Sequence, residues 1–181
     1  MNIPLLAVCA ALTAANARAA AAANAVSKST QTPSFAAALP EGWSPRQEPN
    51  AMLLTGPSDE NRIRSRIVVR YYPPGDKTFS GADAYVKRQS SATMFDPPDA
   101  KPAVVTPTEA AGRKARRIVK ELTKTADPGK MSSREIPSRE ELVVVEGKSG
   151  FYVLSYSAPA ALFDANRAAF LAVLNAFKPL K

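Results

Sequence analysis

The sequence predicts an α+β fold in which helices pack on a mostly antiparallel β-sheet. Several segments alternate apolar and polar residues with period two and are separated by short turns, a pattern typical of hairpin-connected strands. Two other segments, one near the middle of the chain and one at its end, carry apolar residues at helical spacing. Strands in runs, with the helices set apart from them, indicate an α+β fold.

The first 19 residues have the features of a cleavable export signal. An uncharged run extends from Ile3 to Ala15, too short to cross a bilayer, which needs about 20 apolar residues. Ala17-Arg18-Ala19 then provides the small-x-small pattern that a signal peptidase accepts, so cleavage is expected after Ala19. The alternative is a buried Ala-rich helix, because only the α-amino group supplies positive charge ahead of the run. The export signal predicts a periplasmic or secreted protein.

The segment after the signal has almost no residues to bury. Residues 20–34 are mainly Ala, Asn, Ser, Thr and Gln, which predicts a flexible N-terminal tether. Residues 35–181 contain the predicted strands and helices and no internal repeat, so they are expected to form one domain.

The first half of this domain is predicted to contain two strands and a helix. A short strand at 52–55 is closed by Gly56-Pro57, and a longer one at 62–72 by Pro73-Pro74-Gly75. Ser80-Gly81-Ala82-Asp83 has the spacing of a capping box and is expected to open a helix that ends near Ser91.

The second half is predicted to contain four strands and the last helix. Strands are expected at 103–106 and 113–123, and the polar segment 125–140, which contains Pro and Gly, is expected to be a long loop. The strands at 142–145 and 151–156 are joined by the hairpin turn at 147–150. The last helix follows Pro159, and its apolar face is Phe163, Phe170, Leu174 and Phe177.

These elements resemble those of a known superfamily. Phe35 with Leu39-Pro40-Glu41-Gly42-Trp43 follows the leader, a meander closes on the hairpin Gly147 to Tyr156, and the last helix ends in Ala176-Phe177-Lys178. This order resembles the PsbP-like superfamily, which includes the extrinsic subunit of photosystem II and a nuclear Ran-binding factor. The resemblance implies an α/β/α sandwich with a central antiparallel sheet flanked by helices. It implies no particular activity, because the fold does not fix the function, and it assigns no functional residue.

The composition excludes several kinds of catalytic site. The chain has no histidine, and its one cysteine, Cys9, lies in the predicted signal. Ser-His-Asp triads, Cys-His dyads and His-ligated metals are therefore excluded for the mature chain. A lipoprotein signal at Cys9 would need a small residue where Val8 stands, so no lipid anchor is expected. The Gly-Lys-Ser triplet at 147–149 lacks the upstream glycine and the following helix of a phosphate-binding loop.

The carboxylates do not form an evident metal or acid–base site. Asp96 and Asp99 are too few for calcium, which takes six to eight oxygen ligands. Glu140 and Glu141 are adjacent, so on a strand they face opposite ways. We expect no metal and no cofactor.

Clustered basic residues are the main candidate for a functional surface. Four arginines share one face of the predicted strand 62–72: Arg62, Arg64, Arg66 and Arg70. Other basic residues crowd the strand at 113–123, chiefly Arg113, Lys114, Arg116 and Arg117. If the two strands are neighbours, their combined field will attract an anionic partner. The alternative is an ordinary solvated strand face whose charges prevent aggregation.

Four tyrosines have either a functional or a structural role. Tyr71, Tyr72, Tyr152 and Tyr156 either line a groove or pack in the core and across strands, and packing is the expected use. No aromatic residues alternate with the basic ones as stacking platforms, so a nucleic-acid partner is not expected.

These observations favour a non-catalytic exported binding or assembly module. Its expected partner is an anionic component of the cell envelope or an acidic protein, and the mature chain is expected to be a monomer with no transmembrane segment. The alternative is an envelope enzyme that uses carboxylate, Lys or Tyr chemistry in a pocket near the 125–140 loop. A deep pocket with converging polar groups would favour the enzyme, and a shallow basic surface would favour the binding module.

Overall fold

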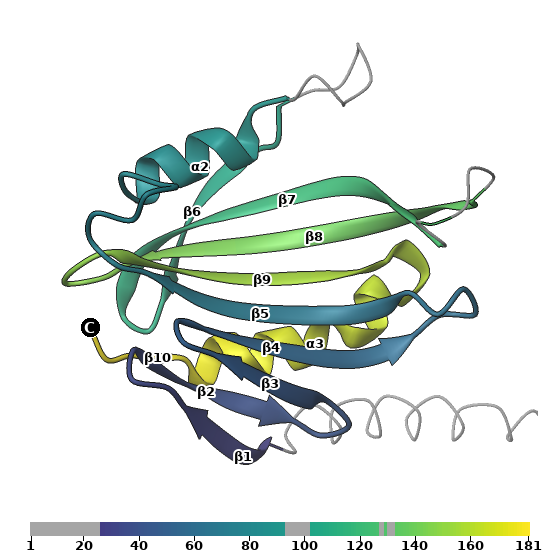
Figure 1. The fold of residues 1–181 in the computed structure, drawn as a ribbon, viewed down its shortest axis with the longest axis horizontal. Helices are drawn as coiled ribbons and strands as arrows, with labels where there is room; N and C mark the ends of the chain where they lie inside the picture. Colours follow the sequence, from purple (N-terminus) through teal and green to yellow (C-terminus); the bar gives the residue numbers. More distant parts are fainter. Residues whose placement is uncertain (1–25, 93–101, 127–128, 130–132) are drawn as a thin grey trace, which may run out of the picture.

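The computed structural model describes residues 26–92, 102–126, 129 and 133–181 (Figure 1). The predicted signal at 1–19, and Asp96 and Asp99, lie outside these residues. The described elements, in chain order, are β1 (Val26–Gln31), β2 (Phe35–Pro40), β3 (Ser44–Glu48), β4 (Ala51–Ser58), β5 (Arg64–Tyr72), α2 (Ala82–Ser90), β6 (Val105–Ala110), β7 (Arg113–Thr125), β8 (Glu135–Glu146), β9 (Phe151–Pro159), α3 (Ala160–Ala176) and β10 (Lys178–Pro179).

The strands form two sheets. The larger has seven strands in the order β3-β4-β5-β9-β8-β7-β6, and every neighbouring pair is antiparallel (Figure 1). The smaller sheet has the order β1-β2-β10 and is also antiparallel. The hairpin predicted at 147–150 is the turn between β8 and β9.

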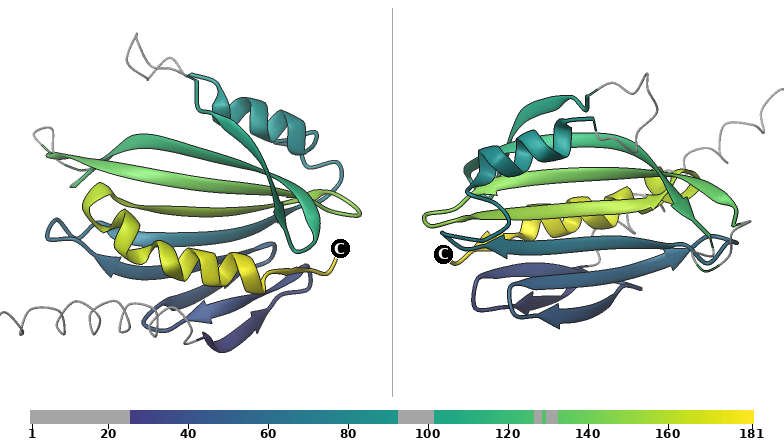
Figure 2. Two further views of the ribbon diagram at one scale, coloured as in Figure 1. Left: turned by 180° about the vertical axis from the view of Figure 1, so that it is seen from behind. Right: turned by 45° about the horizontal axis from the view of Figure 1, so that its top comes forward.

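The two helices lie on opposite faces of the large sheet (Figure 2). Helix α3 packs against β5, β8 and β9 and also against β2 of the small sheet, so it lies between the two sheets. The core on this side includes Trp43, Phe163, Phe170 and Phe177, as the apolar face of the last helix predicts. Helix α2 covers a smaller cluster over β7 and β8 that includes Tyr85, Ile118 and Phe151.

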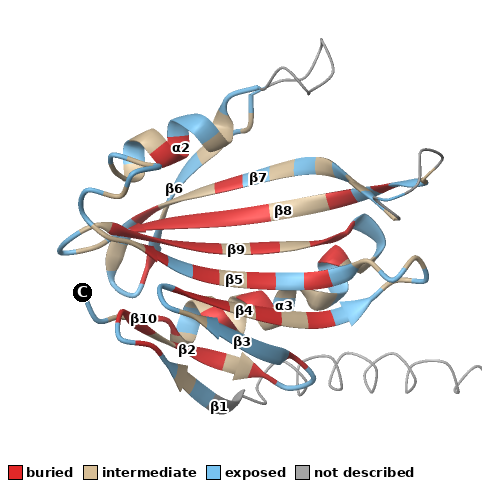
Figure 3. Ribbon diagram, in the orientation of Figure 1, coloured by how far each residue is buried: buried red, intermediate tan, exposed pale blue. Residues whose placement is uncertain are grey.

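The fold is therefore α+β with a mostly antiparallel sheet, as expected. A full α/β/α sandwich is not confirmed, because α2 is only nine residues long and contacts β7 and β8. On the remainder of its side of the sheet, β5 and most of β4 carry half-buried and exposed residues (Figure 3). This open part of the sheet is not covered by a described helix.

Two segments that lack apolar periodicity are strands. Residues 26–31, inside the segment predicted to be a flexible tether, form β1 and pair with β2. The turn between these strands is held by the Thr32 hydroxyl, whose oxygen accepts a hydrogen bond from the Phe35 amide at 3.0 Å. Ser44–Glu48 forms β3, an exposed strand at the edge of the large sheet that the sequence did not predict.

The prediction of a long loop at 125–140 is wrong. β7 continues to Thr125 and β8 begins at Glu135, and these two residues are register partners. Along the start of β8, Ile136 and Ser138 are buried whereas Glu135 and Pro137 are exposed. The alternation typical of a strand is present, but one of its two buried side chains is polar, which conceals the pattern in the sequence. The connection between β7 and β8 is therefore much shorter than predicted.

The capping box predicted before α2 is not formed. The N-cap residue is Gly81, and no side chain caps this end of the helix. Asp83 instead forms an ion pair with Arg116 of β7, so its carboxylate ties the helix to the sheet.

Gly56 marks a close approach between β4 and the Trp43 ring. A Cβ atom on Gly56 would lie 2.7 Å from three ring carbons of Trp43, which is 8% exposed. Gly56→Ala should therefore lower the free energy of unfolding by about 1–3 kcal/mol, since the indole must move within a packed core. Chemical denaturation measures this change. Ser58→Ala, at an exposed position of the same strand, is the control and should change stability by less than about 0.5 kcal/mol.

Candidate functional site

The arginines of β5 lie on the open side of the sheet. Along this strand Ser65, Ile67, Val69 and Tyr71 are buried on the α3 side, whereas Arg64, Arg66 and Arg70 are exposed on the other. The alternation predicted from the sequence is confirmed for this strand.

Arg62 precedes β5 in a tight turn. Its φ of 62° is unusual for a residue other than glycine. Asp59 holds the turn, because its Oδ1 accepts a hydrogen bond from the Ile63 amide at 2.8 Å. The turn places the exposed Arg62 beside the start of β5.

The four basic residues identified at the start of β7 do not join this surface. Two strands, β9 and β8, lie between β5 and β7. Arg116 pairs with Asp83 of α2, while Arg117 points to the α3 side, where Nε donates to Glu141 Oε1 at 2.6 Å. Arg113 donates to the Glu146 carbonyl at 3.2 Å, and Lys114 is exposed. The eight basic residues identified in the sequence are therefore separated in space.

A lysine that the sequence analysis did not single out reaches the β5 arginines instead. Lys124, near the end of β7, extends across β8, and its Nζ donates to the Ser157 hydroxyl of β9 at 3.1 Å. Ser157 is the register partner of Arg66. Lys124 and Arg66 thus come together over the sheet although 58 positions in the chain separate them.

These residues enclose an open cavity that we call the basic groove. Its volume is about 530 Å³, and its lining residues are Arg62, Ile63, Arg64, Arg66, Lys124, Thr125 and Ala126. Among the described residues, the lining contains four cationic side chains and no carboxylate. Within the described part of the chain, Arg62, Arg64 and Arg66 form no ion pair, whereas the more distant Arg70 pairs with Glu48 at 3.7 Å. The groove therefore has excess positive charge.

The pKa of Lys124 reflects this excess of positive charge. Burial lowers the pKa of Lys124 below its ordinary value, and the nearby charge of Arg66 lowers it further. Glu140 acts in the opposite direction, but its own carboxylate pairs with Lys120 at 3.2 Å. A bound anion would offset the repulsion between Lys124 and Arg66.

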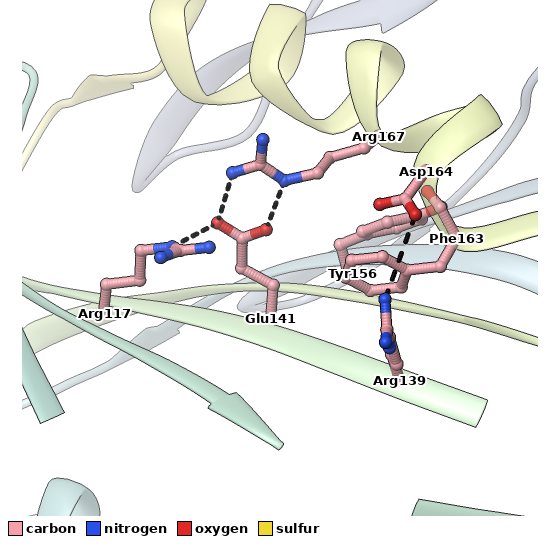
Figure 4. A network of polar contacts seen from close by, with 7 residues as sticks. All are labelled: Arg117, Arg139, Glu141, Tyr156, Phe163, Asp164 and Arg167. Carbon is pink, nitrogen blue, oxygen red and sulfur yellow. Dashed lines mark hydrogen bonds and ion pairs between the residues drawn. The ribbon is translucent and has the colours of Figure 1, made fainter. Parts of the chain in front are cut away.

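A buried carboxylate between two arginines, on the opposite face of the sheet, was also not predicted from the sequence. Glu141 is 1% exposed, and its carboxylate lies between Arg117 of β7 and Arg167 of α3 (Figure 4). Arg167 donates through Nε to Oε2 at 2.8 Å and through Nη2 to Oε1 at 3.1 Å. Burial alone would raise the pKa of Glu141, but the hydrogen bonds from Arg167 and Arg117 outweigh it and lower the pKa.

This cluster is built to hold α3 on the sheet. Both oxygens of Glu141 already accept hydrogen bonds from guanidinium groups, so the carboxylate is not placed as a free general base. Nearby, Arg139 lies 3.9 Å from Asp164 of α3 and over the Phe163 ring, with 5.9 Å to its centroid (Figure 4). Glu140 lies on the other face of β8, so it cannot form an acid–base pair with Glu141, as the strand alternation predicts.

The tyrosines pack in the core. Tyr152 and Tyr156 are fully buried, and their hydroxyls donate to the carbonyls of Ser34 at 3.0 Å and Phe163 at 2.7 Å. Tyr71 is also buried, and Tyr72 stacks on Phe151 with 4.7 Å between ring centroids. The packing alternative is thus confirmed, and these four residues do not form one groove.

The described residues include no group of three or more acidic, His or Cys side chains placed to hold a metal ion. No helix within them is long and apolar enough to cross a membrane.

Comparison with known proteins finds similarity only among solved structures. No protein-family model and no curated protein matches the chain. A structure from Bacteroides thetaiotaomicron has 10% identity and a TM-score of 0.49; the match covers 81% of this chain but only 45% of that one. LpqN of Mycobacterium tuberculosis, described as involved in cell envelope biogenesis, has 13% identity and a TM-score of 0.48, covering 80% of this chain and 82% of LpqN.

Two further matches are to proteins of the kind that the sequence resembles. PsbP of the cyanobacterium Synechocystis has 11% identity and a TM-score of 0.46, covering 84% of this chain and 90% of PsbP. The Ran-binding protein Mog1p of Saccharomyces cerevisiae has 10% identity and a TM-score of 0.43, covering 80% of this chain and 89% of Mog1p. At these values the matches carry no argument about function. A PsbP and a Ran-binding protein, both named by the resemblance, are therefore among the solved structures similar to this chain.

Proposed function

We propose that this chain is a non-catalytic, exported binding module whose basic groove binds an anionic partner of the cell envelope. The observation that carries the proposal is the set of three arginines, Arg62, Arg64 and Arg66, that have no acidic partner among the described residues and share a groove with Lys124. Export rests on the sequence of residues 1–19.

The chemistry of the groove suits a phosphate-bearing partner. A guanidinium group presents a planar fork of donors that matches the oxygens of phosphate and carboxylate. Arg64 and Arg66 are two residues apart on one face of a strand, so their backbone positions are about 7 Å apart, and neighbouring anionic groups can bind side by side. Among the described residues, the lining offers no carboxylate for general acid–base catalysis, which favours binding over an enzyme of the carboxylate type.

Binding to anionic lipid headgroups tests this proposal. The mature protein should sediment with vesicles of phosphatidylglycerol and phosphatidylcholine but not with vesicles of phosphatidylcholine alone. Binding should weaken as salt concentration rises. Arg64→Gln combined with Arg66→Gln should lower the affinity about 30-fold, since each basic residue near an anionic surface contributes about 1 kcal/mol.

A variant with the same net charge provides the control. Lys87→Gln combined with Lys148→Gln also removes two positive charges, from exposed positions outside the groove. This variant should keep its affinity within about threefold of the wild type. Equal losses for the two double variants would show a nonspecific effect of net charge and contradict a groove-based site. Unchanged binding of the arginine variant would place the partner elsewhere.

A further inference from the structure

Among the described residues, Lys124 is the one primary amine that lines the basic groove. Its side chain is half-buried, and Nζ is fixed by the hydrogen bond to the Ser157 hydroxyl at 3.1 Å. Lys148, by comparison, is exposed in the turn between β8 and β9 and lies outside the groove lining. The fold therefore holds one lysine amine at a defined position beside three guanidinium groups.

The charges around this amine favour its neutral, nucleophilic form. Arg66 of β5 faces it across β9, and Arg62 and Arg64 line the same groove. Glu140 of β8 is the one described carboxylate with an effect on the amine in the other direction, and it is paired with Lys120. A lysine that is partly desolvated and close to another cation releases its proton more readily than a lysine in water.

We propose that Lys124 captures phosphorylated aldehydes covalently, with the phosphate held by Arg64 and Arg66 while the Nζ amine forms an imine with the carbonyl carbon. This inference rests on the proposed anion binding by the groove. The lone pair of the amine adds to the carbonyl carbon to give a carbinolamine. The carbinolamine then loses its hydroxyl group and the nitrogen proton as one water molecule, so no oxidant or reductant is needed.

The dimensions and contents of the groove suit such a ligand. A volume of about 530 Å³ is within the usual range of small-molecule sites, roughly 300–1,000 Å³. The same cavity holds the anion-binding guanidinium groups and the nucleophile, and its described lining residues include no carboxylate that would repel the phosphate. Binding the phosphate next to the amine would raise the effective concentration of the aldehyde at Nζ.

Labelling with pyridoxal 5′-phosphate tests the proposal. The full mature protein is incubated with this aldehyde, the imine is reduced with sodium borohydride, and the modified lysines are identified by peptide mass spectrometry. Lys124 should be modified at least fivefold faster than Lys148, and inorganic pyrophosphate should remove this preference. The rate at Lys124 should reach half its maximum at a lower pH than that of Nα-acetyl-lysine amide.

Three comparisons separate this inference from the proposed function. Pyridoxal, which lacks the phosphate, should modify Lys124 at least fivefold more slowly. Equal rates for the two aldehydes would overturn phosphate-guided capture and count against anion binding by the groove. Lys124→Arg keeps the charge, so it should keep its thermal unfolding temperature but lose the selective label. If the wild type binds vesicles and Lys124 is not selectively labelled, covalent capture is overturned while the proposed function stands.

Discussion

Phe170→Ala is expected to lower the free energy of unfolding by about 3–5 kcal/mol, a large share of the stability of a typical domain. Phe170 is fully buried, and its ring stacks on Tyr156 of β9 with 5.6 Å between centroids. Truncation removes a large apolar surface and leaves a cavity between α3 and the sheet. Urea unfolding monitored by circular dichroism measures the loss.

Asn175→Ala provides a control on the same helix. Asn175 is exposed and lies five positions after Phe170. Its replacement should change the free energy of unfolding by less than about 0.5 kcal/mol. A loss below about 1 kcal/mol for Phe170→Ala would mean that α3 is peripheral to the core, which contradicts both its burial pattern and the apolar spacing that predicted it.

The elements with a strong apolar pattern could be predicted from the sequence. β5 alternates without interruption from Arg64 to Tyr71, and α3 places Phe163 and Phe170 on one face at helical spacing. In both, one face is packed on the core and the other is solvated, so burial imposes its period directly on the residue types. The region of α2 was also predicted, although the capping box expected at its start is not formed.

The sequence analysis missed β1, β2, β3, β10 and the first part of β8, and most of these are strands held by pairing with a neighbour. β1 and β3 lie at sheet edges and consist mainly of polar residues, so their order comes from backbone hydrogen bonds to β2 and β4. The first part of β8 contains Pro137 and charged residues but pairs along its length with the end of β7. A single sequence carries little sign of such pairing, because the partner strand lies in another part of the chain.

The candidate site could likewise be predicted from the sequence only in part. Alternation placed Arg64 and Arg66 on a solvated face, whereas Lys124 joins them because its side chain reaches across β8 to Ser157 of β9, the strand that pairs with β5. The order of these strands is a property of the topology and not of the local sequence. The role of Glu141 depends likewise on Arg117 and Arg167, which lie 24 and 26 positions away in the chain.

Glu141→Gln is expected to lower the free energy of unfolding at neutral pH by about 3 kcal/mol. Removing the buried charge leaves Arg117 and Arg167 without their counterion. The amide nitrogen that replaces one carboxylate oxygen also directs its N–H groups toward the guanidinium donors. The loss should lie near the lower end of the range for a broken buried ion pair, about 3–5 kcal/mol, because the two arginine side chains are 37% and 35% exposed and can be rehydrated.

The adjacent Glu140 supplies the control. Its carboxylate is on the opposite face of β8, is about one-quarter exposed at 24%, and has one salt bridge, to Lys120 at 3.2 Å. Glu140→Gln should cost less than about 1 kcal/mol, as for most ion pairs near the surface. If the two variants lose the same stability, the Glu141 cluster does not hold α3 on the sheet.

The pH dependence gives this prediction a second, independent readout. The pKa of Glu141 is lower in the folded protein than its ordinary value of 4.5, so the folded state favours the ionised form. Its contribution is therefore fully present above about pH 4.5 and is lost as the pH falls through the folded-state pKa. The stability difference between the wild type and Glu141→Gln should accordingly be constant near neutral pH and shrink in acid, as denaturant unfolding at a series of pH values will show. A difference that stays unchanged down to the acid unfolding limit would mean that lost packing, and not the ionised carboxylate between two arginines, causes the effect of the substitution.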